Sequence, residues 1–319
     1  MASLIDELLN IPIPQKLWHY TSLQGFLGIV TTKRMWATDL RFLNDEEEFI
    51  HTRTIADEVV RDADEFDADG FPNREWLRKA VSLAFDSGPL ANMQVFVICF
   101  SASEDQLGQW RGYSDGSSGV SLAFDLHHIR PPADSGSGVL FAPCVYNAAR
   151  KKELLLSALY PVKEELTHYY KRAFEAACDQ DPRNRTGNRE EVVNRFLEAN
   201  PTQKRTVEDF KTAVTKTRWN CLRIAALLKN DSFEEENEWR LVLPVLLDEP
   251  VAPRNPPQFR IGKTTLIPYV AHPFSPNKIV DAILGPGSDD SSILAARSFL
   301  KSQGYDLEPR LSRVPYRSS

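Results

Sequence analysis

Residues 233–244, Phe-Glu-Glu-Glu-Asn-Glu-Trp-Arg-Leu-Val-Leu-Pro, join a run of polar side chains directly to an apolar segment that is typical of a β-strand. Because residues two apart along a strand share a face, we expect Glu236, Glu238 and Arg240 to lie on one side of it. Arg240 would favour ionised carboxylates, whereas mutual repulsion and burial would raise the pKa of one of them. The stretch therefore predicts a charged site at a strand end, and the alternative is a solvated edge strand with a surface ion pair.

Residues 16–22, Lys-Leu-Trp-His-Tyr-Thr-Ser, predict a second strand that turns into a helix. His19 falls on the face of this strand opposite to Tyr20. Thr21 and Gln24 form a capping-box pattern for the helix that follows. Sites are often built at such junctions because polar atoms are held at a rigid position. His19 is thus a candidate site residue, and its alternative role is that of a hydrogen-bonded structural histidine.

Residues 94–103 form a near-continuous apolar run that ends in hydroxyl groups, which predicts a strand buried on both faces. Ser101 and Ser103 share a face at its end. Trp110 and Tyr113 follow three residues apart, so on a helical turn they form one aromatic shelf. Such a shelf either stacks a planar ring of a ligand or belongs to the core.

Residues 44–48, Asn-Asp-Glu-Glu-Glu, indicate the start of another helix. Asn44 or Asp45 can satisfy the free amides of the first turn, and the glutamates complement the positive end of the helix. A magnesium site is the alternative, although consecutive acids on a helix point in different directions.

The composition turns helical from about residue 148 to residue 229, with breaks expected at Pro161 and Pro201 and a polar loop at 181–188. Lys229 closes this helical insert just before the stretch of residues 233–244, so we expect it to face the same cleft. Further segments indicate helices at 3–9 and 290–302, a loop at 61–73, and strands at 35–38, 119–125 (half-buried), 140–146, 259–262, 266–270, 278–285 and 311–315. The pattern predicts one α+β domain over residues 1–319, in which the strand-rich terminal parts form one cleft.

The composition is that of an ordinary globular protein, with 42% hydrophobic and 26% charged residues. A net charge of -6 provides no overall positive field to collect nucleic acid. The four cysteines are widely spaced and lack a metal-binding pattern, which indicates free thiols in a reducing compartment. Since no signal peptide or membrane-spanning run is evident, we expect a cytoplasmic protein with no membrane partner.

The order of these motifs resembles the DUF2971 family across nearly the whole chain apart from the helical insert. The resemblance is carried by residues 17–22, 42–45, 100–103 with Trp110 and Tyr113, 236–240, 266–269, 283–286 and 312–316.

A second resemblance supplies an expected chemistry. A first strand with His-Tyr-Thr, a middle strand ending in Phe-Ser-x-Ser and a late strand with Glu-x-Glu are similar to the site of ADP-ribosyltransferases. This resemblance implies split small β-sheets that grip NAD as the substrate. It gives a ribose or phosphate contact to His19, an ordering role to Ser101 and Ser103, and the nicotinamide ribose to Glu238. Arg-specific members usually carry an Arg where this chain has His19, so the resemblance leaves the acceptor undecided.

The resemblance also fits the expected reaction. Breaking the nicotinamide-ribose bond develops positive charge, which a preorganised carboxylate at Glu238 would stabilise in the transition state. Glu236 would orient or deprotonate the acceptor, which is a protein, a nucleic acid, a small molecule or water. The residues expected to contact NAD are Tyr20, Thr21, Ser101, Ser103, Trp110, Arg111, Tyr113 and Arg240, with a ring-stacking role for Trp110 or Tyr113 and a pyrophosphate role for Arg111 or Arg240. A toxin or antiviral effector would be compatible with this activity.

Two other functional classes stay open at this point. One is a metal-dependent nuclease or phosphodiesterase with Asp45, Glu46, Glu236 and Glu238 around Mg²⁺. The other is a non-catalytic sensor that binds a nucleotide-like ligand in the same cleft.

Overall fold

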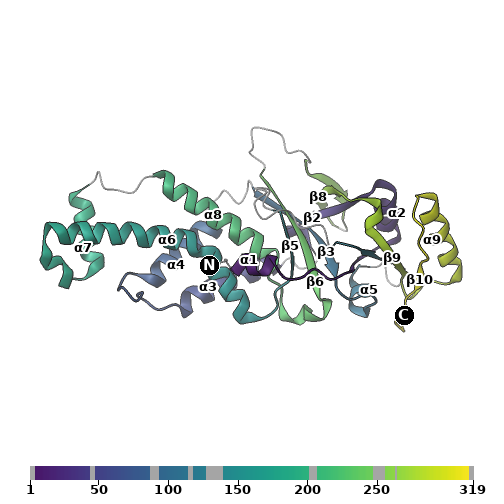
Figure 1. Ribbon diagram of the computed structural model, residues 1–319, viewed down its shortest axis with the longest axis horizontal. Coiled ribbons are helices and arrows are strands. Elements are labelled where there is room, and N and C mark those ends of the chain that lie inside the picture. Colours follow the sequence, from purple (N-terminus) through teal and green to yellow (C-terminus); the bar gives the residue numbers. More distant parts are fainter. Residues whose placement is uncertain are drawn as a thin grey trace. The chain divides into compact units, whose positions relative to one another are not determined.

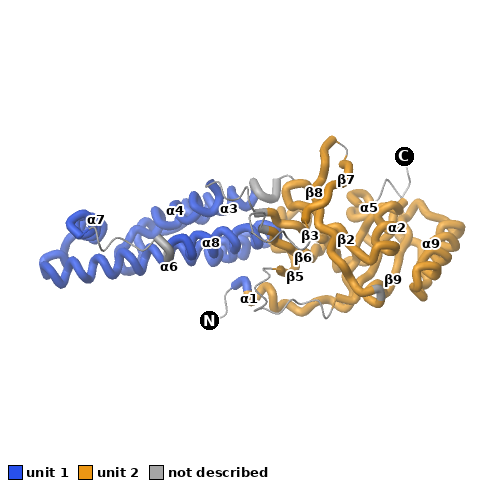
Figure 2. Tube along the Cα trace, turned by 90° about the horizontal axis from the view of Figure 1, so that it is seen from above, with its two compact units in different colours: residues 1–5, 47–91, 147–228 blue, residues 6–46, 92–146, 229–319 orange. Residues whose placement is uncertain are grey.

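The computed structural model describes residues 4–43, 47–86, 93–113, 118–126, 139–200, 207–246, 256–262 and 264–315. Figure 1 shows its helices and strands in chain order. The chain forms two compact units, each assembled from three separate segments (Figure 2). Unit 1 comprises residues 1–5, 47–91 and 147–228, and unit 2 comprises residues 6–46, 92–146 and 229–319. The helical part therefore includes residues 47–91 as well as the predicted insert.

Among the described residues, unit 2 holds one ten-stranded sheet rather than two small sheets. Its spatial order is β10-β9-β4-β1-β3-β2-β8-β7, with β6 paired to both β3 and β5. β10 and β9 are parallel, whereas β3 and β6 are antiparallel, so the sheet is mixed. The bounds are β1 Leu17–Thr21, β2 Arg34–Asp39, β3 Met93–Ser101, β4 Val120–Phe124, β5 Leu140–Pro143, β6 Glu238–Leu246, β7 Gln258–Ile261, β8 Leu266–Pro273, β9 Ile279–Leu284 and β10 Arg310–Leu311.

The sheet forks at β3. One edge of β3 pairs with β6 along its whole length, and the last pair is Ser101 opposite Glu238. The other edge pairs with β2 at Phe96 and Val97, and with β1 only where Trp18 lies opposite Ser101. β1 and β2 therefore diverge along residues 98–100, which leaves the outer edge of β3 to other partners there.

The core of unit 2 lies against one face of β3 and β6, which we call the core face. Phe100 and Trp239 are directly opposite each other and both belong to a buried apolar cluster. The opposite face carries Ser101 and Glu238, because neighbouring residues alternate between faces. We call it the site face.

β4 corrects the prediction of a half-buried strand, because all five of its residues are buried. Leu122 packs into the main core, whereas Ala123 joins a second cluster with Trp18, Tyr20 and Trp110. The alternating side chains of β4 therefore point into two buried clusters, one on each face of the strand, and neither face is exposed to solvent.

Two helices of unit 2, α2 Leu23–Thr32 and α9 Asp290–Ser302, begin close to the predicted positions. Unit 2 also contains α5 Leu107–Tyr113 and the 3₁₀ turns η1 Leu40–Phe42, η5 Asp231–Glu236 and η6 Pro276–Lys278. The short helix α1 Leu4–Leu9 precedes β1. The cap of α2 is Ser22, whose side chain accepts from the Gly25 amide at 3.1 Å. The predicted cap, Thr21, is instead the last residue of β1.

Unit 1 consists of the helices α3 Glu47–Asp62, α4 Asn73–Phe85, α6 Ala148–Gln180, α7 Arg189–Ala199 and α8 Val207–Ala225, with the 3₁₀ turn η3 Pro182–Thr186. Pro161 does not break the insert as predicted, because it lies inside the continuous helix α6. Within the same turn, the Val162 amide donates to the Thr217 hydroxyl of α8 at 3.3 Å. The predicted polar loop at 181–188 contains η3. None of the described helices is long and apolar enough to cross a bilayer.

Candidate functional site

Glu238, the first residue of β6, is the centre of the site and is only 3% exposed. Its Oε1 accepts from Arg240 Nε at 2.9 Å, and its Oε2 accepts from Arg240 Nη2 at 3.1 Å. Arg240 is itself 2% exposed. The two side chains share a face because they are two residues apart on β6, as the sequence predicts.

Lys229 adds a second buried cation and joins Glu238 to Glu236. Its Nζ donates to Glu238 Oε2 at 2.7 Å and to Glu236 Oε2 at 2.5 Å. The Lys229 side chain is 1% exposed, whereas that of Glu236 is 15% exposed. We call Lys229, Glu236, Glu238 and Arg240 the ion cluster. Lys229 thus contacts both predicted carboxylates, and the expectation that it faces a cleft stays a prediction.

Glu236 belongs to the ion cluster, but it does not lie on the strand as predicted. β6 begins only at Glu238, and Glu236 ends the 3₁₀ turn η5. Asn237 between them has a left-handed backbone with φ of 44°. Its carbonyl accepts from the Ala102 amide at 3.0 Å, which ties this turn to the chain just beyond β3. Both carboxylates therefore converge on one ammonium group instead of standing side by side along a strand.

The opposite charges of the ion cluster favour the ionised forms of Glu238 and Lys229. Burial alone would raise the pKa of Glu238, but the attraction of Arg240 and Lys229 outweighs it and lowers the pKa to about 2. Burial likewise opposes the charge on Lys229, yet Glu238 and Glu236 raise its pKa. The expected rise in a carboxylate pKa is thus wrong for Glu238, because two cations rather than one contact it. At neutral pH Glu238 is ionised.

Ser101 and Ser103 hold the loop next to the ion cluster. The Ser101 hydroxyl donates to the Glu236 carbonyl at 2.7 Å and accepts from the Ser103 amide at 3.0 Å. Ser101 is 1% exposed, so its hydroxyl is committed to these backbone partners. Ser103 is partly buried, and its hydroxyl lies 3.4 Å from Asn237 Nδ2. Ser101 therefore fixes the backbone of this loop. The predicted roles of Ser101 and Ser103 at a ligand stay predictions.

Three further residues lie near the ion cluster: Tyr146 and Cys99, which had no predicted role, and Tyr113, which was predicted to stack on a ligand ring. The Glu238 amide donates to the Tyr146 hydroxyl at 3.0 Å. The Cys99 thiol hydrogen-bonds to Glu238, and burial followed by that negative charge raises the pKa of Cys99 well above its usual range. Burial also raises the pKa of Tyr113, which lies close enough to feel the charges of Glu238 and Lys229. Cys99 sits two residues before Ser101 on β3, a spacing that could have identified it.

His19 lies on the core face and not beside Glu238. β1 pairs Trp18 with Ser101, so Trp18 and Tyr20 share the site face, whereas His19 and Thr21 point to the other. The His19 ring contacts Phe100, and its Nδ1 donates to the Cys99 carbonyl at 2.8 Å on the forked edge of β3. Burial lowers the pKa of His19, which favours the neutral ring. The predicted roles of His19 and Thr21 at a ligand stay predictions.

Trp110 and Tyr20 belong to the protein interior rather than to an open shelf. Trp110 is fully buried, and its ring lies 4.9 Å from that of Tyr20 in an edge-on contact. Its Nε1 donates to Asp105 at 2.7 Å. The Tyr20 hydroxyl donates to the Ser103 carbonyl at 2.9 Å and so supports the same loop as Ser101. Of the predicted shelf, Tyr113 alone is partly exposed.

The two arginines predicted to bind pyrophosphate differ in their surroundings. Arg240 is buried and engaged with Glu238, so it stabilises the site rather than projecting from it. Arg111, in the last turn of α5, is exposed. Arg240 is therefore a partner of Glu238, and the pyrophosphate roles of Arg111 and Arg240 stay predictions.

The structure describes two of the four residues of the alternative magnesium site. Asp45 and Glu46 lie outside the described residues. Glu236 and Glu238 are described, but the Lys229 ammonium lies between them, where a cation held by both carboxylates would have to bind. Over the described part of the chain, no group of three or more His, Cys, Asp or Glu side chains is arranged to hold a metal ion.

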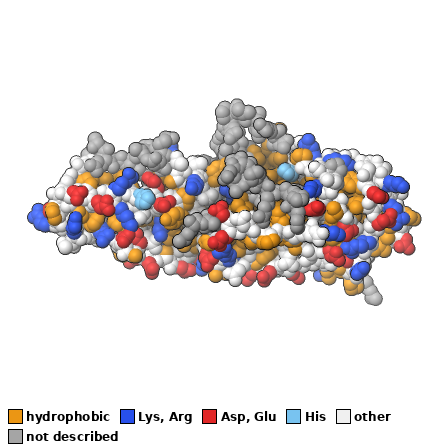
Figure 3. Space-filling view, in the orientation of Figure 1, with side chains coloured by type: hydrophobic (Ala, Val, Ile, Leu, Met, Phe, Trp, Pro, Cys, Tyr) orange, Lys and Arg blue, Asp and Glu red, His pale blue; other side chains and the backbone are white. Residues whose placement is uncertain are grey.

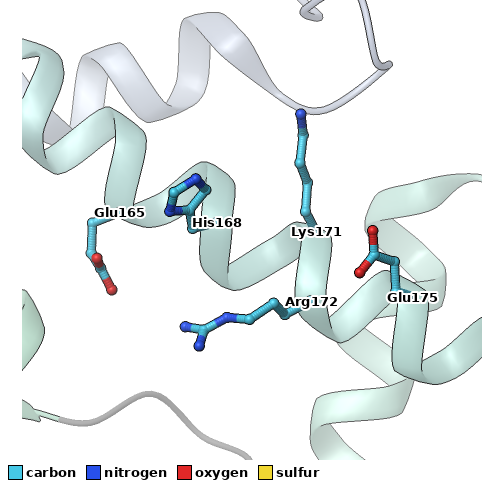
Figure 4. Close-up of a pocket in the computed structure, with 5 residues that line it drawn as sticks. All are labelled: Glu165, His168, Lys171, Arg172 and Glu175. Atoms are coloured by element: carbon cyan, nitrogen blue, oxygen red, sulfur yellow. The ribbon is translucent and has the colours of Figure 1, made fainter.

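A separate hollow lies on the helical unit. Glu165, His168, Lys171, Arg172 and Glu175 line it from successive turns of α6 (Figure 4). Lys171 is paired with Asp69. On the face shown in Figure 3, acidic and basic side chains of the described residues are interspersed rather than gathered into one patch.

Residues 109–241 match the family described as "Protein of unknown function (DUF2971)". The match supports the DUF2971 family, and it corrects the expected extent of the resemblance, since it includes the helical insert and omits the motifs near both ends of the chain. No curated protein matches the chain. No solved structure matches it either.

Proposed function

We propose that this protein is an ADP-ribosyltransferase-like enzyme that cleaves the nicotinamide-ribose bond of NAD or a related nucleotide. The observation that carries the proposal is the ionised Glu238, held at the start of β6 on the site face, with the partly exposed Glu236 beside it. A carboxylate fixed by Arg240 and Lys229 needs little reorganisation when positive charge develops on a ribose.

The roles follow from exposure and contacts. Glu238 supplies the negative charge, and Glu236 is the carboxylate that reaches solvent and an acceptor. Tyr113, partly exposed and uncharged, is the ring available for stacking on nicotinamide. Arg111 is the exposed cation for the pyrophosphate. The acceptor is a protein, a nucleic acid, a small molecule or water.

The test uses NAD labelled on its adenylate, with a mixed lysate that supplies protein and nucleic-acid acceptors. We expect wild-type protein to release nicotinamide and Glu238→Gln to be slower by about 10²-fold or more, as for the loss of other preorganised electrostatic groups. Glu234→Gln is the matched control, because Glu234 is exposed on the same 3₁₀ turn. Circular dichroism of each variant shows whether the fold is kept. Absence of both release and labelling by folded wild-type protein contradicts the proposal.

A second candidate is a nucleotide-binding module without turnover. It is favoured by one observation, namely that Arg240 and Lys229 already occupy both oxygens of Glu238. Calorimetric titration with NAD distinguishes the two functions. Binding by wild type with no nicotinamide release supports the module, and a further ligand screen would then define the nucleotide.

A further inference from the structure

Lys229 is a buried lysine that precedes β6 in the chain, and its ammonium group contacts two carboxylates. Its ammonium is 2.7 Å from Glu238 Oε2 and 2.5 Å from Glu236 Oε2. Arg240 contacts Glu238 through two nitrogens. Each cation of the ion cluster thus contacts Glu238, and Lys229 also contacts Glu236.

The backbone explains why this lysine is needed. A strand passing straight through residues 236–238 would fix both glutamates by its pleat. Here the left-handed Asn237 interrupts the strand, so Glu236 sits on the 3₁₀ turn η5. The backbone of this turn is held by Ser101, but the carboxylate of Glu236 is directed by Lys229.

We propose that Lys229 is the positioning residue of this site, which holds the Glu236 carboxylate beside Glu238 so that it receives the proton of the acceptor. The inference rests on the proposed function for its catalytic consequence. Its structural half, the coupling of Lys229 to Glu236, stands independently of any substrate.

The position of Lys229 between the two carboxylates gives a specific expectation for substitutions. Lys229→Met removes the cation that contacts both groups and leaves the like charges of Glu236 and Glu238 close to each other. Adding Glu236→Gln removes this repulsion. The double variant should therefore unfold at a higher urea concentration than Lys229→Met alone, whereas Glu236→Gln by itself should lower the midpoint of the wild type.

The experiment measures the urea midpoints and the kinetics of nicotinamide release for wild type, both single variants, the double variant and Lys229→Arg. We expect Lys229→Met to lower kcat by about 10²-fold while KM changes little, since a misplaced group costs that much in well-aligned reactions. Glu236→Gln should cause no further loss of kcat in the Lys229→Met background. Lys229→Arg should recover part of kcat because it keeps the charge. Lys216→Met, on the exposed surface of α8, is the control.

Three outcomes overturn the inference. Additive midpoint changes mean that Lys229 does not hold Glu236. If the urea midpoint changes are coupled but Lys229→Met keeps the wild-type kcat, Lys229 stabilises the fold and does not position Glu236 for catalysis. If Lys229→Met does not fold and Glu236→Gln does not rescue it, the lysine serves only Glu238. If the wild type releases no nicotinamide, the proposed function is wrong. The urea midpoints of the single and double variants still show whether Lys229 and Glu236 are coupled.

Discussion

At the residue scale, Glu238 shows how a buried charge is kept. A carboxylate that is 3% exposed would be neutral without partners, because desolvation disfavours the charged form. Arg240 and Lys229 reverse that preference and lower its pKa to about 2. The same contacts make Glu238 a source of pH-dependent stability, since its pKa differs between the folded and unfolded chain.

The pH dependence has a definite sign. A carboxylate whose pKa is lowered on folding stabilises the fold fully above its unfolded value, near 4.5, and this contribution is lost as the pH falls through about 2. The contribution is on the order of 3 kcal/mol. We expect the difference in unfolding free energy between wild type and Glu238→Gln to be constant above pH 5 and to shrink between pH 4 and 2, as measured by urea unfolding. Glu234→Gln serves as the exposed control, and a difference that does not change with pH contradicts this account.

At the element scale, α6 continues through Pro161 although a proline removes one helical hydrogen bond and crowds the preceding turn. The structure compensates from another helix. Thr217 of α8 is fully buried, and its hydroxyl accepts from the Val162 amide. The amide next to the proline thus keeps a partner in a region where an unsatisfied one is costly.

We predict that Thr217→Val destabilises the helical unit by about 1–3 kcal/mol, because a buried amide loses its acceptor. In a Pro161→Ala background the loss should be smaller, since a regular turn can offer the Val162 amide a helical carbonyl instead. Urea unfolding of the two single variants and the double variant measures this coupling. Equal losses in both backgrounds would show that the hydroxyl serves packing alone.

At the scale of the whole molecule, each of the two units is built from interleaved segments and has buried apolar clusters of its own. The helical unit has its own buried cluster, in which Phe196 of α7 packs with Val192 and Val193 and with Ala173 and Ala177 of α6. The sheet unit contains the ion cluster and the main core. A unit with its own core can lose stability without equal effect on its neighbour.

Phe196→Ala should therefore destabilise the helical unit by about 3–5 kcal/mol, the usual range for deleting a buried aromatic ring. Hydrogen exchange followed by mass spectrometry should show faster exchange in α6 and α7 and unchanged protection in β3 and β6. Nicotinamide release should keep its wild-type kcat. Equal acceleration in β3 and β6 would mean that both units unfold as one.

Local patterns predicted many elements because they depend on neighbouring residues. The strands at Leu17–Thr21 and Arg34–Asp39 and the helix at Asp290–Ser302 lie close to the predicted bounds. Two predictions from local sequence were wrong. Thr21 matches the pattern of a helix cap but is the last residue of a strand. Pro161 was expected to break the helix, but Thr217 of α8 accepts a hydrogen bond from the neighbouring Val162 amide. Both outcomes depend on partners that are distant in sequence.

By itself, the sequence determined a strand through Glu238 and Arg240 as far as Pro244, the pairing of Glu238 with Arg240, and the mixture of helices and strands, since periodicity and short spacing decide them. Only the tertiary structure decided that Asn237 turns Glu236 toward Lys229, that His19 faces away from Glu238, and that residues 47–91 join the helical unit. The physical reason is that a pleat fixes faces within one strand, whereas register between strands and convergence of side chains depend on contacts across the fold.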